Sequence, residues 1–145
     1  MTDPVRGHTR RRSESGSLAI ELAMLAPSIL LIFALIFVYG RAAQVNGTLE
    51  SGTRDAARSV TLARSYDEAR DRARAVLLDA MKDAPQSCQN SLHVAVGLPY
   101  EAGRPITVDA DCTYDISDLG LPGAPGTLTA RSSFTSMLDP YRGLQ

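Results

Sequence analysis

The chain has 145 residues, which allows one modest domain with short appendages. Its formal net charge of −1 argues against a nucleic-acid-binding protein held by bulk positive charge. Aromatic residues make up only 6% of the sequence, so a large packed core is not expected. The basic residues are nevertheless unevenly placed, because several arginines gather near the N-terminus: Arg6, Arg10, Arg11 and Arg12.

Residues 1–13 are polar and show no apolar periodicity, which predicts a disordered tail. His8 belongs to this tail and is expected to be solvated. The two observations give no reason to place a binding site in the first residues of the chain.

An apolar run without any charged residue extends from Leu22 to Tyr39. At 1.5 Å per residue it covers most of the ~30 Å hydrocarbon core of a bilayer, and Arg41 can snorkel at its end. A buried core helix is less consistent, because the run is apolar on every face and the remaining chain is too small to enclose it. We predict a transmembrane helix over residues 17–40. The preceding arginines predict a cytoplasmic N-terminus and an extracytoplasmic C-terminal part.

A cleaved secretory signal is an alternative interpretation of the same segment. It would share the basic leader, but its apolar region is normally about 7–15 residues long, which is shorter than this run. A small-x-small site exists at Gly40-Arg41-Ala42, although the arginine fits poorly beside a cleavage site. This alternative predicts a secreted domain released after Ala42.

Helical periodicity continues beyond the span, and we predict an extracytoplasmic helical region over residues 41–84. Gly47 and Gly52 each weaken a helix by up to about 1 kcal/mol relative to alanine. The pattern therefore allows either a continuous helix or one that bends or frays at the glycines. In the continuous form, small residues four apart would let a like helix approach closely: Ala43, Gly47 and Ser51.

A second helix is predicted from Ser65 to about Lys82. Ser65 and Glu68 match a capping box, in which the serine side chain and the glutamate side chain satisfy free backbone N–H groups. Apolar residues then repeat on one face and charged residues occupy the others. Pro85 is expected to end this helix.

The period changes to two after residue 85, which predicts a small strand-rich module over residues 85–145. Alternating runs occupy residues 91–98, 105–116 and 127–138, and a Gly/Pro-rich loop separates the last two. The expected fold class is α+β: a long N-terminal transmembrane helix, a second short helix, and a three-stranded antiparallel sheet laid on that second helix.

The two cysteines, Cys88 and Cys112, are expected to form a disulfide. A module of this size gains from a covalent link, and an extracytoplasmic location favours oxidation. Closing a loop of about 25 residues contributes roughly 3–3.5 kcal/mol in the chain-entropy model. Two unrelated buried thiols are the alternative. A zinc site is disfavoured, because His8 lies across the membrane and His93 stands alone.

No catalytic or cofactor-binding motif is present, so no enzymatic activity, cofactor or metal is predicted. Asp109, Asp111 and Asp115 could suggest a calcium loop, but the turn glycine and terminal glutamate of such a loop are missing. Their alternation is that of the wet face of a strand. The residues that require a functional explanation are Gly16, Ser17 and Glu21, because a carboxylate is costly so close to an apolar span.

A basic leader, a glycine, and an apolar helix with glutamate five residues after that glycine resemble a type IV prepilin or pseudopilin. Within this class the chain resembles the TadE-like proteins of the tight-adherence (Flp) pilus system over roughly residues 14–64. The segments that carry the likeness are "GSLAIELAMLAPSILLIF", with Pro27 shortly after the glutamate, and "GTRDAAR". The short helix and cysteine-containing module fit the family by layout.

The resemblance implies that a prepilin peptidase removes residues 1–16 by cutting between Gly16 and Ser17. Cutting would create an α-ammonium at Ser17, and Glu21 lies one helical turn away, at about 6 Å. The pair would fix the axial register of helices packed side by side, in one chain or between neighbours. The implied partners are the membrane, the peptidase, other pilin-like subunits and the pilus assembly platform, without nucleic acid.

Two residues depart from the family pattern. Leu22 stands where these pilins often carry an aromatic residue, and Ser17 replaces the phenylalanine of better-known type IV pilins. The module is also larger than in the short main pilin, which favours a minor pilin or assembly component. The main alternative is an uncleaved single-pass envelope protein whose outer module binds a partner or ligand.

Overall fold

The structure is a computed structural model that describes residues 14–141. The chain divides into two compact units, Met1–Phe37 and Val38–Gln145. The tail predicted over residues 1–13 lies outside the described residues. The fold contains three α-helices, a short 3-10 helix and three strands within the described range.

Helix α1 runs without interruption from Glu14 to Val60, a length of 47 residues. It includes Pro27, Gly47 and Gly52, so the helix does not fray at the glycines. The predicted boundary at residue 40 therefore falls inside one helix. We call Ala19–Phe37 the apolar segment of α1 and Val38–Val60 its C-terminal segment.

Helix α2 spans Tyr66–Ala80 and is preceded by Ser65 as N-cap, as predicted. The Ser65 hydroxyl accepts a hydrogen bond from the Glu68 N–H at 3.3 Å. The Glu68 carboxylate does not accept a hydrogen bond from the Ser65 backbone N–H, as it would in a complete capping box. It accepts from the Arg64 N–H at 2.9 Å and from the Arg72 guanidinium at 2.8 Å. These contacts, the backbone bond first and Arg72 second, lower the pKa of Glu68.

The end of α2 differs from the prediction. The helix stops at Ala80, and Pro85 is the N-cap of a separate short helix, α3, over Gln86–Asn90. A proline can begin a helix as well as end one, since the first helical N–H groups need no partner within the helix. Pro85 therefore marks the start of α3 and not the end of α2.

The sheet is three-stranded and antiparallel, as predicted, with the order β1-β2-β3. Its strands are β1 (His93–Val96), β2 (Pro105–Asp115) and β3 (Thr127–Met137). Val108 in the central strand faces Val96 on one side and Phe134 on the other. Strands β2 and β3 have 11 residues each, so only β1 is short.

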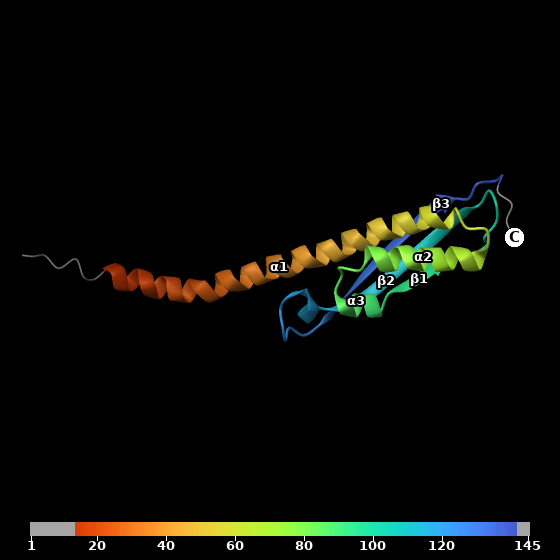
Figure 1. Ribbon diagram of the computed structural model, residues 1–145. Coiled ribbons are helices and arrows are strands. Elements are labelled where there is room, and N and C mark those ends of the chain that lie inside the picture. Colours follow the sequence, from red (N-terminus) through yellow and green to blue (C-terminus); the bar gives the residue numbers. More distant parts are fainter. Residues whose placement is uncertain (1–13, 142–145) are drawn as a thin grey trace, which may run out of the picture. The chain divides into compact units, whose positions relative to one another are not determined.

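One face of the sheet is buried and the other is wet. Within Val38–Gln145, α2 and the C-terminal segment of α1 lie along the buried face (Figure 1). On the opposite face, threonine hydroxyls pair across the strands, as between Thr107 and Thr135 at 2.9 Å. The β2 residues on the buried face are those expected from the alternation: Ile106, Val108, Ala110, Cys112 and Tyr114.

Candidate functional site

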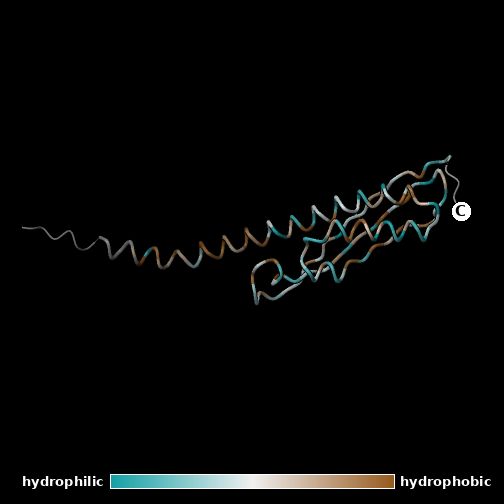
Figure 2. The backbone as a smooth tube through the Cα atoms, viewed as in Figure 1, coloured by the Kyte–Doolittle hydropathy of each residue, from teal (hydrophilic) through white to brown (hydrophobic). Residues whose placement is uncertain are grey.

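The apolar segment of α1 exposes its side chains all around the helix. Figure 2 shows this stretch as a nearly continuous hydrophobic run. Phe33 is 65% exposed, and no residue of the most apolar window is buried inside the structure. The helix containing it is long and apolar enough, by length and composition, to cross a membrane. This agrees with a single-pass membrane protein.

Glu21 is exposed near the beginning of this apolar segment. Gly16 and Ser17 lie in the first turns of the same helix. Four residues of α-helix advance by about 6 Å, which places the Cα atoms of Ser17 and Glu21 one turn apart. The helix therefore holds the three candidate residues in the spacing expected from the sequence, with Glu21 beside exposed apolar side chains.

Gly52 marks where the C-terminal segment of α1 meets α2. A Cβ atom added there would lie 2.9 Å from the Ala80 Cβ and 3.2 Å from Leu77 Cδ2. A Cβ added at Gly47 meets nothing within 4 Å. The small-residue surface that contacts another helix in this chain is therefore at Gly52. The predicted stripe of Ala43, Gly47 and Ser51 is exposed.

Two tyrosine hydroxyls connect the turn between α1 and α2 to the end of β1 and to the loop that follows it. Tyr100 donates toward the carbonyl oxygens of Val60, at 2.8 Å, and Ala63, at 3.0 Å, where α1 ends. Tyr66 donates to the Val96 carbonyl at 3.0 Å, which ties the start of α2 to the end of β1. Sequence periodicity carries no signal for these contacts, since each joins residues 30 or more apart.

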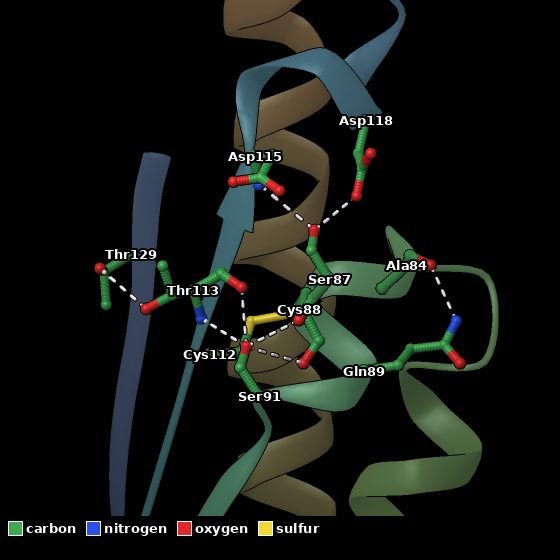
Figure 3. The surroundings of a disulfide bond; sticks show 10 residues. All are labelled: Ala84, Ser87, Cys88, Gln89, Ser91, Cys112, Thr113, Asp115, Asp118 and Thr129. Carbon is green, nitrogen blue, oxygen red and sulfur yellow. Dashed lines mark hydrogen bonds between the residues drawn. A yellow bond between two sulfur atoms is a disulfide. The ribbon is translucent and has the colours of Figure 1, made fainter. Parts of the chain in front are cut away.

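Cys88 and Cys112 form a disulfide, as predicted, and both residues are fully buried. The bond joins α3 to the middle strand (Figure 3). The Ser87 hydroxyl donates to Asp118 at 2.6 Å and accepts from the Asp115 N–H at 3.2 Å. Serines on both sides of Cys88 thus add hydrogen bonds to the covalent link.

Ser91 continues this attachment on the other side of the disulfide. Its hydroxyl accepts from the Thr113 N–H at 2.9 Å and lies 2.7 Å from the Thr113 carbonyl oxygen. A serine side chain therefore takes the place of a strand partner for Thr113 (Figure 3). The disulfide and these hydrogen bonds therefore hold the short helix α3 against the C-terminal part of β2.

Replacing Cys88 and Cys112 together by alanine should lower the free energy of unfolding by about 3 kcal/mol, because the open chain gains conformational entropy. The measurement is urea unfolding of the full chain in detergent micelles, followed by circular dichroism. Dithiothreitol should shift the wild type to the midpoint of the double variant and leave that variant unchanged. Equal midpoints for wild type and variant without reductant would contradict a stabilising disulfide.

The aspartates of β2 lie along the wet face of the sheet. No group of three or more histidine, cysteine, aspartate or glutamate residues is placed to hold a metal ion within the described residues. Asp109 and Asp115 are exposed on the wet face of the sheet, and Asp111 is half-buried there. The Asp111 carboxylate lies 3.6 Å from His93 Nδ1 on β1. The alternation of β2 is enough to account for their positions.

Comparison with known families gives a match to the TadE-like protein family over residues 16–58. The match begins at Gly16, includes Glu21 and the apolar segment of α1, and ends at Arg58. No curated protein and no solved structure matches the chain. The resemblance inferred from the glutamate-containing apolar helix and the segment "GTRDAAR" is thereby confirmed, and residues 16–58 of this chain are TadE-like.

Proposed function

We propose that this protein is a pseudopilin-like component of tight-adherence pilus assembly. The observation that carries the proposal is the joint position of Gly16 and Glu21 at the head of an exposed apolar helix, within the part of the chain that matches the TadE-like family. The protein contributes no chemistry of its own. It acts by associating with other pilin-like subunits through α1.

A prepilin peptidase removes residues 1–16 by cutting between Gly16 and Ser17. The new α-ammonium at Ser17 then lies at the edge of the hydrocarbon region, where an unpaired charge is costly. Glu21 supplies the opposite charge one turn further along, either within the chain or to a neighbouring subunit. A helix displaced along its axis would lose this pairing, so the pair selects one register between adjacent helices.

The leader is cytoplasmic and the module built from residues 38–145 is extracytoplasmic. The arginines before the span support this orientation through the positive-inside bias. The buried disulfide also supports it, because such bonds persist in oxidising compartments. The size of the module favours a minor pilin or an assembly component over the bulk filament subunit.

The mature N-terminus tests this proposal directly. Intact-mass and N-terminal peptide measurements on protein from its native membrane should give a chain that begins at Ser17. A Gly16→Leu variant should keep its leader, since the peptidase reads the residue before the cut. An intact wild-type leader would favour the alternative, an uncleaved envelope protein with a partner-binding module. A chain starting at Ala43 would favour a secreted domain.

A further inference from the structure

The free edge of β1 forms one side of a groove whose other side is α2. Strand β1 is at the edge of the sheet, and α2 runs alongside it (Figure 1). The groove has a volume of about 230 Å³. We call it the edge groove, and the residues that line it are Arg70, Asp71, Arg74, Leu92, His93 and Val94.

At this edge, some backbone N–H and C=O groups of β1 point away from the sheet. The Gly97 N–H donates to the Thr107 carbonyl of β2 at 2.7 Å. Backbone polar groups alternate along an antiparallel strand, so those of Ala95 also face β2, whereas those of Val94 and Val96 face away. The Val96 carbonyl accepts from Tyr66, but Val94 directs its N–H and C=O to the free edge. The edge groove therefore contains unpaired strand backbone.

The helix side of the groove is positively charged. Arg70 and Arg74 are exposed, and neither forms an ion pair with another residue of the described range. The Arg70 guanidinium lies over the Tyr66 ring, 5.9 Å from its centroid, which helps to position the charge. Asp71 also lines the groove and offsets part of this charge.

The spacing of the two arginines matches that of alternate residues in an extended chain. Residues four apart on a helix are separated by about 6 Å along its axis. Alternate residues of a strand are separated by about 6.6 Å and point to the same side. A strand that pairs with Val94 could thus present two carboxylates to Arg70 and Arg74 together.

We propose that the edge groove binds an extended acidic segment of a partner protein, which adds a fourth strand beside β1 and carries two carboxylate residues two positions apart. The backbone of Val94 and the N–H of Val96 supply the main-chain hydrogen bonds, and Arg70 and Arg74 select the charge. This site is separate from α1, so it does not depend on processing of the leader.

Binding of synthetic peptides to the full chain in detergent micelles tests the proposal, with fluorescence anisotropy as the readout. The probe is a seven-residue β-prone peptide with glutamates at its third and fifth positions. A peptide with glutamine at both positions should bind about tenfold more weakly, because two charge-assisted contacts are lost. A peptide with adjacent glutamates should also bind more weakly, because its carboxylates point to opposite faces.

Protein variants locate the site. Arg70→Ala and Arg74→Ala should each weaken binding about threefold to fivefold, whereas Arg58→Ala, an exposed arginine of α1, should have no effect. Asp71→Asn should tighten binding by about twofold to threefold, since it removes a repelling charge. Circular dichroism of each variant should equal that of the wild type, because all these side chains are exposed.

Two further measurements test the addition of a strand to β1 separately from the recognition of charge. Methylating the backbone nitrogens on one edge of the peptide should abolish binding, and the bound acidic peptide should slow hydrogen exchange over Leu92–Val96. Equal affinity of the glutamate and glutamine peptides, unchanged binding by both arginine variants, or full affinity of the methylated peptide would each overturn the proposal. Absence of saturable binding up to millimolar peptide would overturn it as well.

Discussion

A Glu21→Ala variant should insert into the membrane as well as the wild type and yet fail to support pilus assembly. Insertion is not expected to fall, because a carboxylate inside a span opposes insertion by up to about 3 kcal/mol. Assembly should fail because the Ser17 ammonium loses the carboxylate that sets the helix register. The measurements are the membrane-bound fraction, co-purification with pilin-like subunits, and filament counts by electron microscopy in a host that makes the pilus.

Controls separate a charge effect from general damage to the span. Ser28→Ala changes another exposed polar residue of the apolar segment, but its hydroxyl donates only to the Leu25 carbonyl of the same helix, at 2.7 Å. It should leave assembly intact. Glu21→Asp keeps the charge on a shorter side chain and should restore part of the activity. Normal piliation by Glu21→Ala would rule out the pairing role.

The pairing model also predicts that Glu21 matters only after the leader is cut. The Gly16→Leu variant keeps the leader and never forms the Ser17 ammonium. In that background, Glu21→Ala should cause no further loss of subunit association. An additional loss of the same size as in the processed protein would mean that Glu21 acts without the amine.

The sequence predicted those features that depend on local pattern. The rest of the chain is too small to bury the apolar run over Leu22–Tyr39, so this run indicates a membrane span directly. The alternation in β2 predicted which side chains are buried, because a strand places successive residues on opposite faces. The disulfide followed from the presence of only two cysteines in a small module.

Features that depend on contacts between distant segments were missed. Helix α3 has five residues, which is too short for a helical period to appear in the sequence. The tyrosine contacts at Val60 and Val96 depend on how three elements meet, as do the charges of the edge groove. No pattern within one element contains that information.

Two glycines of α1 show most directly that the pattern within one element does not reveal contacts with another. Gly47 and Gly52 look alike in the sequence, and both interrupt a helical pattern. Their roles differ because a Cβ at Gly52 would meet Ala80 and Leu77 of α2, whereas a Cβ at Gly47 would meet nothing within 4 Å. The stripe of Ala43, Gly47 and Ser51 was predicted for packing against a like helix of another chain, and it stays a prediction. Within this chain, the position of α2 decides that Gly52 is the glycine that must stay small.

Gly52→Ala should therefore destabilise the module, whereas Gly47→Ala should stabilise it. Both changes gain up to about 1 kcal/mol from better helix propensity. At Gly52 the new Cβ would be 2.9 Å from the Ala80 Cβ, so the two helices must separate, at an overpacking cost of about 1–3 kcal/mol. The free energies of unfolding of the two variants should differ by about 2 kcal/mol, measured by urea unfolding of the full chain in micelles.

A compensating change establishes that the contact with α2 is the cause. Ala80→Gly removes the Cβ that would clash, and Leu77 Cδ2, at 3.2 Å, is the movable end of a flexible side chain. Ala80→Gly alone should destabilise slightly, because glycine weakens the last turn of α2. Combined with Gly52→Ala it should recover stability relative to the sum of the single effects, whereas combined with Gly47→Ala the effects should simply add. If Gly52→Ala matched Gly47→Ala, or if its cost were independent of residue 80, the close crossing of α1 and α2 would not be what requires glycine at position 52.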